Sequence, residues 1–188
     1  MILILTGPVH AGKTSFLKNL LPVLKARGVP VSGYLSLSVL KRGRMSGYDL
    51  FDIKADKSVP FLRRKGRAGW QKVGSHFFLP SGLQAAEDKI LGCPIGGWLV
   101  VDEVGPQELA GRGVWPALSA VLSRSELDCL LVVRRPLLDE LRVLLGKRPI
   151  EVFDIAAENV LPVLLERLSK SGAGTARKKA ARKARAES

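Results

Sequence analysis

The chain has 188 residues, 46% of them hydrophobic, which is enough for a single domain with one core. No stretch reaches the ~18 apolar residues of a membrane span, and the short N-terminal apolar run lacks the features of a signal peptide, so we expect a cytoplasmic protein with no membrane partner. The net charge of +13 is typical of contact with nucleic acid, and Cys93 and Cys129 have neither disulfide-framework nor zinc-site spacing.

The first predicted element is a strand that runs into a phosphate-binding loop. The apolar run Met1–Leu5 is typical of a central parallel strand, and the P-loop pattern G-x-x-x-x-G-K-[ST] follows it. Glycines at both ends of the loop let successive backbone N–H groups point at the phosphates, and the next helix adds its positive dipole end. The expected nucleotide-binding residues are Gly7, Pro8, Val9, His10, Ala11, Gly12, Lys13, Thr14 and Ser15.

Two residues of this loop have chemical roles beyond binding. Lys13 can reach the β- and γ-phosphates, which makes it the first catalytic candidate. The Thr14 hydroxyl can ligate Mg²⁺. The loop therefore predicts a nucleoside triphosphate as ligand and Mg²⁺ as cofactor.

Strands and helices alternate along the rest of the chain. Helical spacing of apolar residues predicts helices, and short apolar or alternating runs predict strands. The first half holds a helix over Ser15–Arg27, strands over Val29–Leu37 and Gly47–Ile53 joined as an antiparallel hairpin, a basic loop over Pro60–Gly74, a short strand within Val73–Leu79 and a helix over Ser81–Leu91. The second half holds strands over Trp98–Val101, Cys129–Val133 and Ile150–Ile155, and helices over Pro106–Leu122, Pro136–Leu145 and Ala157–Ser169. The first of these helices is interrupted by Gly111, Gly113 and Pro116. This order predicts an α/β, three-layer P-loop fold with a mostly parallel central sheet and an antiparallel hairpin.

A pair of acids follows the strand over Trp98–Val101, in the expected form of a Walker B element. Asp102 is predicted to hold the Mg²⁺ shell together with Thr14, and Glu103 is predicted to polarise the water that attacks the γ-phosphorus. Functional residues of parallel sheets lie at the carboxyl ends of the strands, so the acids and the P-loop should face the same crevice.

Arginines supply candidates for the cation that meets the charge developing on the γ-phosphate. Arg134 and Arg135 directly follow the strand over Cys129–Val133, and Arg134 is the catalytic candidate that we name. A salt bridge or a helix-entry charge is the alternative reading of both. Arg63, Arg64 and Arg67 of the basic loop are further candidates.

Three segments resemble a small P-loop nucleoside-triphosphatase family known from thermophiles and from vertebrates, where it is called cancer-related nucleoside-triphosphatase. The segments are Thr6–Thr14, Gly47-Tyr48 and Asp102–Leu109, and the resemblance spans about Met1–Leu168. It implies a RecA-like variant of the P-loop fold and Mg²⁺-dependent hydrolysis of several nucleoside triphosphates to diphosphate and phosphate. It also implies the roles already given to the loop and to the acid pair. Glu108 matches a second acid of the family, which orients the water or holds structure.

The chain departs from the family pattern at three places. Val9-His10 stands where the family often has Pro-Gly. We expect His10 to be a surface residue of the loop, with shaping of the loop or contact with phosphate as the alternatives. Asn159 is followed by Val160 where the family tends to have arginine. Leu35–Ser38 replaces an acidic-Val-Arg segment. The departures leave the substrate contacts open.

The positive charge is concentrated in two segments, and one of them, the C-terminal segment, separates from the rest of the chain by its composition. Residues 170–188 hold seven Lys/Arg and one acid, Glu187, and account for +6 of the net charge, so we expect a nucleoside-triphosphatase domain over 1–169 and a basic, disordered tail over 170–188. A second basic cluster lies within Lys54–Lys72. The tail could make weak contact with nucleic acid, or it could serve only as a solvated, solubilising segment.

The leading hypothesis is a nucleoside-triphosphate hydrolase. No Asn/Thr-Lys-x-Asp guanine motif is present, so we expect broad base specificity. One alternative is a P-loop nucleotide or small-molecule kinase, which would exclude water from the γ-phosphate rather than activate it with Glu103. The other alternative is an NTPase switch regulated by RNA or by a partner, which the basic tail suggests.

Overall fold

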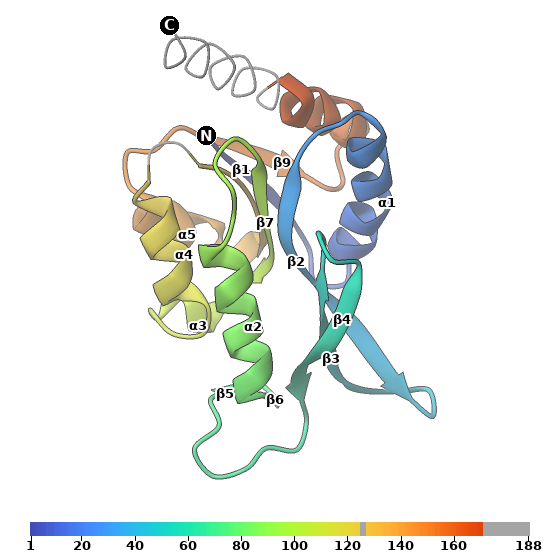
Figure 1. Ribbon diagram of the computed structural model, residues 1–188, viewed down its shortest axis with the longest axis vertical. Coiled ribbons are helices and arrows are strands. Elements are labelled where there is room, and N and C mark those ends of the chain that lie inside the picture. Colours follow the sequence, from blue (N-terminus) through green and yellow to red (C-terminus); the bar gives the residue numbers. More distant parts are fainter. Residues whose placement is uncertain (125–126, 171–188) are drawn as a thin grey trace, which may run out of the picture.

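The computed structural model describes residues 1–124 and 127–170. Within these residues, nine strands form one sheet in the order β5-β6-β4-β3-β2-β7-β8-β1-β9, and helices cover both of its faces (Figure 1). The strands are β1 (Ile2–Gly7), β2 (Val31–Lys41), β3 (Arg44–Asp52), β4 (Lys57–Arg63), β5 (Lys72–Val73), β6 (His76–Phe78), β7 (Trp98–Val104), β8 (Asp128–Arg134) and β9 (Ile150–Asp154). The helices are α1 (Lys13–Ala26), α2 (Pro80–Leu91), α3 (Pro106–Leu109), α4 (Trp115–Leu122), α5 (Leu138–Leu145), a 3₁₀ turn over Arg135–Leu137 and a helix over 160–170. No helix in this part of the chain is both long and apolar enough to cross a membrane.

The sheet has a parallel half and an antiparallel half. β2, β7, β8, β1 and β9 run parallel to one another, as the apolar strands predicted. Beyond β2 the sheet continues through β3, β4, β6 and β5, which pair antiparallel. The predicted hairpin is confirmed as β2–β3, but the sheet is less parallel than predicted because β4, β6 and β5 extend that hairpin.

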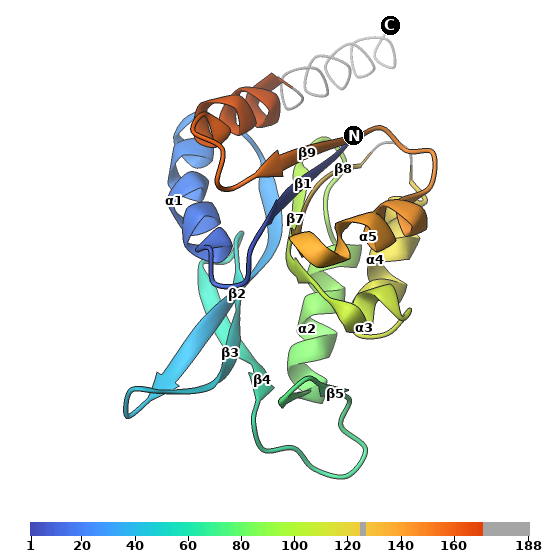
Figure 2. The same cartoon turned by 180° about the vertical axis from the view of Figure 1, so that it is seen from behind.

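Two hydrophobic cores lie on opposite faces of the sheet and explain why the parallel strands are apolar without interruption. Ile2 and Ile4 of β1 belong to the core that includes α2, α4 and α5. Leu3 and Leu5 belong to the other core, together with α1 and the helix over 160–170, which lie side by side in Figure 2. A strand that is buried on both faces needs apolar side chains at every position. The predicted three-layer α/β arrangement is confirmed.

The prediction of a loop over Pro60–Gly74 is wrong at both ends. β4 includes Pro60 and runs to Arg63, and β5 begins at Lys72. Pro60 lies opposite Asp49 of β3, in the part of β4 that β6 does not reach. On the side of β4 away from β3 there is thus no strand that needs the N–H which proline lacks. The basic, aperiodic sequence that predicted a loop therefore includes the ends of two short strands.

The predicted helix over Pro106–Leu122 is two helices, α3 and α4. Gly111 and Gly113, with φ of +75° and +57°, form the turn between them in the left-handed region that a continuing helix does not visit. Pro116 lies in the first turn of α4, where a missing N–H costs no helical hydrogen bond. The glycines therefore end one helix, and the proline belongs to the start of the next.

Gly33 lets β2 lie against β7. Its φ is +105°, and a Cβ at this position would overlap the carbonyl oxygen of Val100. Only glycine tolerates both the backbone conformation and the close approach. The pairing brings Ser36, three residues further along β2, to the end of β7.

The predicted tail over 170–188 lies outside the described residues except for Lys170. Lys170 ends the described part of the last helix and forms an ion pair with Glu166, one helical turn earlier. The predicted boundary between residues 169 and 170 stays a prediction.

Candidate functional site

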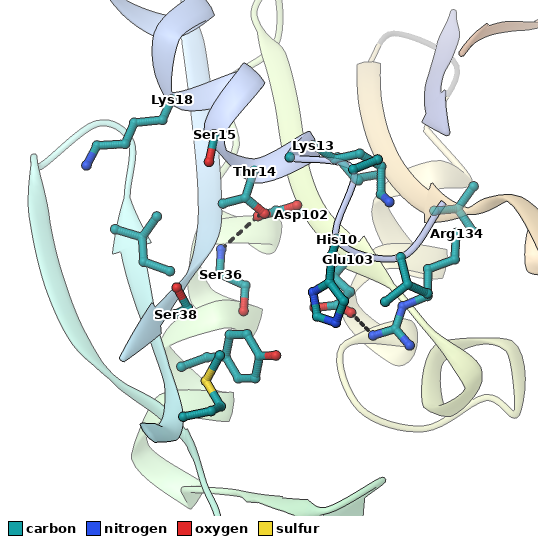
Figure 3. Close-up of a pocket in the computed structure, with 18 residues that line it drawn as sticks. His10, Lys13, Thr14, Ser15, Lys18, Ser36, Ser38, Asp102, Glu103 and Arg134 are labelled. Atoms are coloured by element: carbon teal, nitrogen blue, oxygen red, sulfur yellow. Dashed lines mark hydrogen bonds and ion pairs between the residues drawn. The ribbon is translucent and has the colours of Figure 1, made fainter. Parts of the chain in front are cut away.

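The P-loop joins β1 to α1, and its backbone has the conformation that the glycine spacing predicted (Figure 3). Gly7 and Gly12 have φ of +155° and +80°. A Cβ on Gly7 would collide with the side chain of Ile155, so this position is closed to larger residues. His10 also has a positive φ, +62°, and its exposed side chain lines the candidate pocket. Its position therefore combines a strained loop conformation with access to the site.

Lys13 lies over the loop to which it belongs. Its ammonium donates to the carbonyl oxygens of Gly7 and Pro8, at 3.2 and 2.6 Å. Burial and the neighbouring Arg134 guanidinium lower the pKa of Lys13. Gly7 and Pro8 accept these bonds through their carbonyl oxygens and do not line the pocket, so their predicted contact with nucleotide stays a prediction.

Asp102 joins three elements at one buried carboxylate. One oxygen, Oδ2, accepts hydrogen bonds from the Thr14 hydroxyl of α1 at 2.8 Å and from the Ser36 N–H of β2 at 3.0 Å. The other oxygen, Oδ1, is buried without a hydrogen-bond partner among the described residues. Burial raises the pKa of Asp102 to about 6, against the lowering effect of the two hydrogen bonds. An orphaned buried oxygen next to a hydroxyl is a reason to look for a missing ligand.

The donor set at Asp102 fits Mg²⁺. Mg²⁺ takes hard oxygen ligands and is held through one or two carboxylates together with water and phosphate oxygens. Thr14 Oγ1 and the free Asp102 Oδ1 are oxygens of this kind. No group of three or more His, Cys, Asp or Glu that could hold a metal occurs in the described ranges, so these ranges offer no all-protein cage. The two predicted metal ligands are thus brought together, whereas metal binding itself stays a prediction.

A bulge at the end of β7 directs the two acids. Val101 lies opposite Leu131 of β8, but Val104 lies opposite Val133, so β7 has one residue more than its partner. Val101 and Val104 consequently face the same core although they are three residues apart. Glu103, within the bulge, has φ +73°. Non-glycine residues held in this region cost free energy and concentrate at functional sites.

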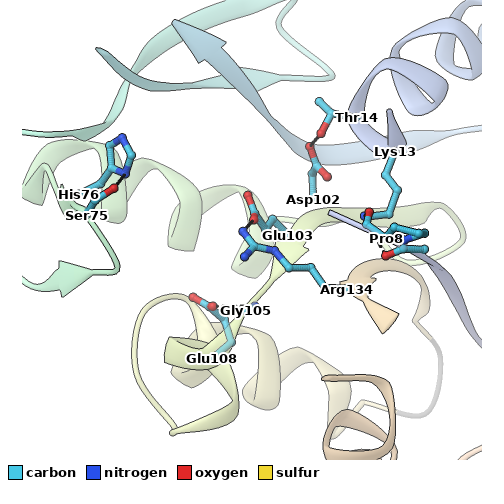
Figure 4. A network of polar contacts seen from close by, with 11 residues as sticks. Pro8, Lys13, Thr14, Ser75, His76, Asp102, Glu103, Gly105, Glu108 and Arg134 are labelled. Carbon is cyan, nitrogen blue, oxygen red and sulfur yellow. Dashed lines mark hydrogen bonds and ion pairs between the residues drawn. The ribbon is translucent and has the colours of Figure 1, made fainter. Parts of the chain in front are cut away.

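Glu103 is paired with Arg134 across the ends of two neighbouring strands (Figure 4). Arg134 ends β8 and lies beside Gly7 in the register of β8 with β1, so it stands next to the P-loop. Both side chains are partly exposed and line the pocket. The next residue, Arg135, is paired instead with Asp154 at the end of β9 and does not line the pocket. The geometry therefore separates the two arginines that the sequence left as alternatives.

The arginines of the basic loop are directed elsewhere. Arg63 donates to the carboxylate of Asp49 and to the carbonyl oxygen of Tyr48, which ties β4 to β3. Arg64 and Arg67 are exposed and are not among the pocket residues. None of these three arginines lies where the sequence suggested a phosphate contact.

Glu108 holds the turn after β7. Its two carboxylate oxygens accept the N–H groups of Gly105, at 3.0 Å, and of Val114, at 3.4 Å. Its side chain is buried, and burial raises its pKa. Of the two roles that the resemblance left open, the contacts favour the structural one, because this carboxylate connects the start of α3 to the start of α4.

The pocket is a cavity of about 500 Å³ between the P-loop and the β2–β3 hairpin. It brings together every predicted catalytic and metal-binding residue and most of the predicted loop. Sequence reasoning missed the lining residues that come from the hairpin and from the second turn of α1, namely Ser36, Leu37, Ser38, Met45, Tyr48 and Lys18. The Gly47-Tyr48 step was a signal for the hairpin wall. The departure at Leu35–Ser38 was another such signal, but the bond from Ser36 to Asp102 had none, because it is made by a backbone N–H.

Comparisons with known proteins agree with this site. A family model described as NTPase matches residues 2–168. The chain is 28% identical to the cancer-related nucleoside-triphosphatase homolog of Bos taurus, covering 89% of this chain and 96% of the relative. It is 30% identical to nucleoside-triphosphatase THEP1 of Methanopyrus kandleri, covering 87% of this chain and 97% of the relative.

Two solved structures share the fold. The solution structure of a human cancer-related nucleoside triphosphatase superposes with a TM-score of 0.72 at 25% identity, over 90% of this chain and 97% of that one. The crystal structure of THEP1 from Aquifex aeolicus superposes with a TM-score of 0.59 at 19% identity, over 89% and 96% of the two chains. At that identity the second likeness concerns the fold alone.

The buried Asp102 carboxyl should make stability depend on pH. Its folded pKa of about 6 exceeds the ordinary value of 3.8, so folding favours the protonated form. This stabilisation is complete below about pH 4 and is lost as the pH rises through about 6. In metal-free buffer, the wild type should lose about 3 kcal/mol of unfolding free energy between about pH 4 and about pH 8 through this group. Asp102→Asn has no such group, so its unfolding free energy should rise by that amount relative to the wild type over the same range. Urea denaturation at a series of pH values measures the gain.

Asp139→Asn is the matched control, because it removes a carboxylate from an exposed position on α5. If Asp102→Asn gains no more than Asp139→Asn over the same pH range, the raised pKa of Asp102 is wrong.

Proposed function

The chain belongs to the NTPase family, and from this premise we propose that it hydrolyses a nucleoside triphosphate to the diphosphate and phosphate at the P-loop pocket, with Mg²⁺ as cofactor. The observation that carries the proposal is the convergence of five side chains from the start of α1 and the ends of β7 and β8. Lys13, Thr14, Asp102 and Glu103 line one cavity, and Arg134 completes its wall. Positioning and charge stabilisation are what phosphoryl transfer requires from a protein.

Thr14 and Asp102 would hold Mg²⁺ in this proposal. The support is the hydroxyl of Thr14 beside a carboxylate whose second oxygen has no partner. When bound, the metal would neutralise charge on the phosphate oxygens. The Ser36 N–H keeps the carboxylate in place from the other side, so that Asp102 is oriented before any ligand arrives.

Glu103 orients the attacking water and accepts its proton. The water oxygen forms a bond to the γ-phosphorus, the bond from that phosphorus to the bridging oxygen breaks, and the diphosphate leaves with the electron pair. The bulge supports this role, because it places Glu103 at the pocket surface immediately after the buried Asp102. A water so directed distinguishes hydrolysis from transfer to an acceptor, which requires water to be excluded.

Arg134 and Lys13 supply the positive charge. Lys13 lies over the P-loop, and Arg134 stands at the end of β8 beside it, near enough to lower the pKa of Lys13. We propose that Arg134 donates to the γ-phosphate oxygens as their charge changes in the transition state. Its ion pair with Glu103 holds both groups at the site.

The remaining assignments are also part of the proposal. The position of β8 between the P-loop strand β1 and the acidic strand β7 supports the RecA-like variant of the P-loop fold. Broad base specificity is supported by the pocket lining, in which the described residues include neither Asn nor Gln. A cytoplasmic location is supported by Cys93 and Cys129, two free thiols buried in the same core.

Phosphate release from ATP, GTP, CTP and UTP tests the reaction. With Mg²⁺ and no acceptor, all four should be hydrolysed, with kcat/KM values within about tenfold of each other. Chelation with EDTA should abolish release. Phosphoryl transfer that occurs only when a hydroxyl acceptor is added would overturn the proposal in favour of a kinase.

Glu103→Gln tests the water-activating role. Because the amide accepts no proton at neutral pH, kcat should fall by roughly 10²–10⁴-fold while KM changes little. Steady-state phosphate release measures both constants. Glu151→Gln is the matched control, since Glu151 is also a partly exposed carboxylate paired with an arginine, Arg167. Wild-type turnover in Glu103→Gln would show that another group activates the water.

Arg134→Ala and Arg135→Ala form a second matched pair, because the two residues are adjacent and each is paired with an acid. Arg134→Ala should lower kcat by about 10³-fold, and Arg135→Ala should leave it near wild type. Arg134→Ala should lower kcat further in the Glu103→Gln background, because Arg134 acts on the phosphate. If the double variant is no slower than Glu103→Gln alone, Arg134 only positions Glu103.

A further inference from the structure

The positive charge of the described domain comes from one segment. Residues 41–72 contain ten Lys/Arg and three Asp, a net charge of +7. Residues 1–40 and 73–169 together contain thirteen Lys/Arg and thirteen Asp/Glu, so they are neutral overall. A charge that is concentrated in one segment of an otherwise balanced domain is a reason to look for an acidic partner there.

Seven of these basic residues occupy two protrusions that leave the same end of the sheet and point apart (Figures 1 and 2), which we name the basic arms. The first arm is the tip of the β2–β3 hairpin, and the second is the segment from the end of β4 to the start of β5 (Figure 1). Arg63, which ends β4, lies opposite Gly47 near the start of β3, so both arms leave the sheet at the same end. The residues of the arms, all exposed, are Lys41, Arg42, Arg44, Arg64, Lys65, Arg67 and Lys72.

The acids of the same segment do not compensate the arms. Asp49 is paired with Arg63, and Asp52 is paired with Lys89 of α2. Asp56 lies in the β3–β4 turn, at the other end of the strands. Among the described residues, none of the seven basic side chains of the arms forms an ion pair. The arms are therefore a surface of uncompensated charge.

The second arm also carries an aromatic side chain that is open to a ligand. Trp70 is half-exposed, and the Arg67 guanidinium lies over its ring, 5.9 Å from the centroid. Gly66 is packed so closely on the ring of Phe77 that a Cβ would collide with it, which anchors the arm on β6. An indole and a guanidinium held together on an anchored segment provide a stacking surface for a base.

We propose that the basic arms bind single-stranded nucleic acid, with the Lys and Arg side chains on the phosphates and Trp70 stacked on a base. Exposed cations alone would suit any polyanion, and the Arg67–Trp70 pair is what favours bases. The β2–β3 hairpin also supplies Met45 and Tyr48 to the wall of the catalytic pocket, so the bound strand would lie beside the mouth of that pocket.

Fluorescence anisotropy with labelled RNA and DNA of about 20 nucleotides tests the surface, on the full-length chain without nucleotide and between about 50 and 200 mM KCl. Lys41→Glu/Arg44→Glu changes the first arm and Lys65→Glu/Arg67→Glu the second. Each should weaken single-strand binding by about tenfold or more and reduce the salt slope by about 1.4, since each lost phosphate contact accounts for about 0.7. The basic tail is the same in all variants, so differences report the arms.

Lys54→Glu/Lys57→Glu is the matched control. It makes the same charge change in exposed residues at the β3–β4 turn, at the far end of these strands, and should bind like wild type.

Trp70→Ala should weaken single-strand binding by about tenfold without changing the salt slope, because stacking releases no counterions. Unchanged circular dichroism and urea denaturation show that the arm variants are folded.

Three outcomes would overturn the proposal. Arm variants that bind as the Lys54→Glu/Lys57→Glu control does would place the binding elsewhere. Duplex DNA bound as tightly as the single strand, with no effect of Trp70→Ala, would leave a non-specific polyanion surface. Binding to vesicles of anionic phospholipid that depends on the arms, without binding to single strands, would identify a membrane surface. Because binding is measured without nucleotide, it stands or fails separately from the hydrolytic function.

Discussion

The buried carboxylate of Asp102 is the interaction on which the site depends. It connects the first turn of α1, through Thr14, to β2, through the Ser36 N–H, from its own position at the end of β7. Three segments that are far apart in the sequence are thereby held within hydrogen-bonding distance of one another. The cost is a desolvated carboxyl with one unpartnered oxygen, and its raised pKa reflects that cost. A divalent cation at the unpartnered oxygen would offset this desolvation cost. In the proposed mechanism the same carboxylate therefore serves both the structure and metal binding.

The parallel half of the sheet converts this anchor into a site with charges of both signs. The carboxyl ends of β1, β7 and β8 meet at one edge and carry the P-loop, the acid pair and Arg134. In a regular strand, Asp102 and Glu103 would point to opposite faces of the sheet. The extra residue in β7 and the left-handed backbone of Glu103 remove that alternation, so one acid stays buried while the next reaches the pocket. Local strain is thus placed where two neighbouring acids need different surroundings.

The antiparallel half of the sheet contributes in a different way. β2 belongs to both halves, since it pairs parallel with β7 and antiparallel with β3. Its inner end supplies Ser36 to the Asp102 anchor, and its outer part supplies the hairpin wall of the pocket and the first basic arm. Gly33 permits the close approach to β7 on which this arrangement rests. One strand therefore connects the candidate site to the first basic arm.

Much of the site could be predicted from the sequence, because its chemistry is encoded in short contiguous patterns. The P-loop needs its glycines and Lys13 at fixed spacing, and an apolar strand that ends in Asp102-Glu103 can be recognised without knowledge of its neighbours. The β-α order likewise indicated the three layers, since strands buried on both faces must be apolar throughout. The strand that contains Pro60 was misread as loop, because whether a strand tolerates the missing N–H of proline depends on which neighbouring strand lies beside it. The glycines between α3 and α4 were recognised as interruptions, but only the structure shows that their left-handed backbone separates two helices.

What only the tertiary structure decided is which groups meet. Arg134 and Arg135 are indistinguishable as adjacent cations after one strand, and they separate because β8 lies between β7 and β1, so that one arginine reaches Glu103 and the other reaches Asp154. Ser36 acts through a backbone N–H, which no side-chain pattern marks. The sequence by itself determined the ligand chemistry, because that chemistry depends on residue type and local spacing. The partners of each group were decided by strand order and register, because these depend on contacts between distant segments.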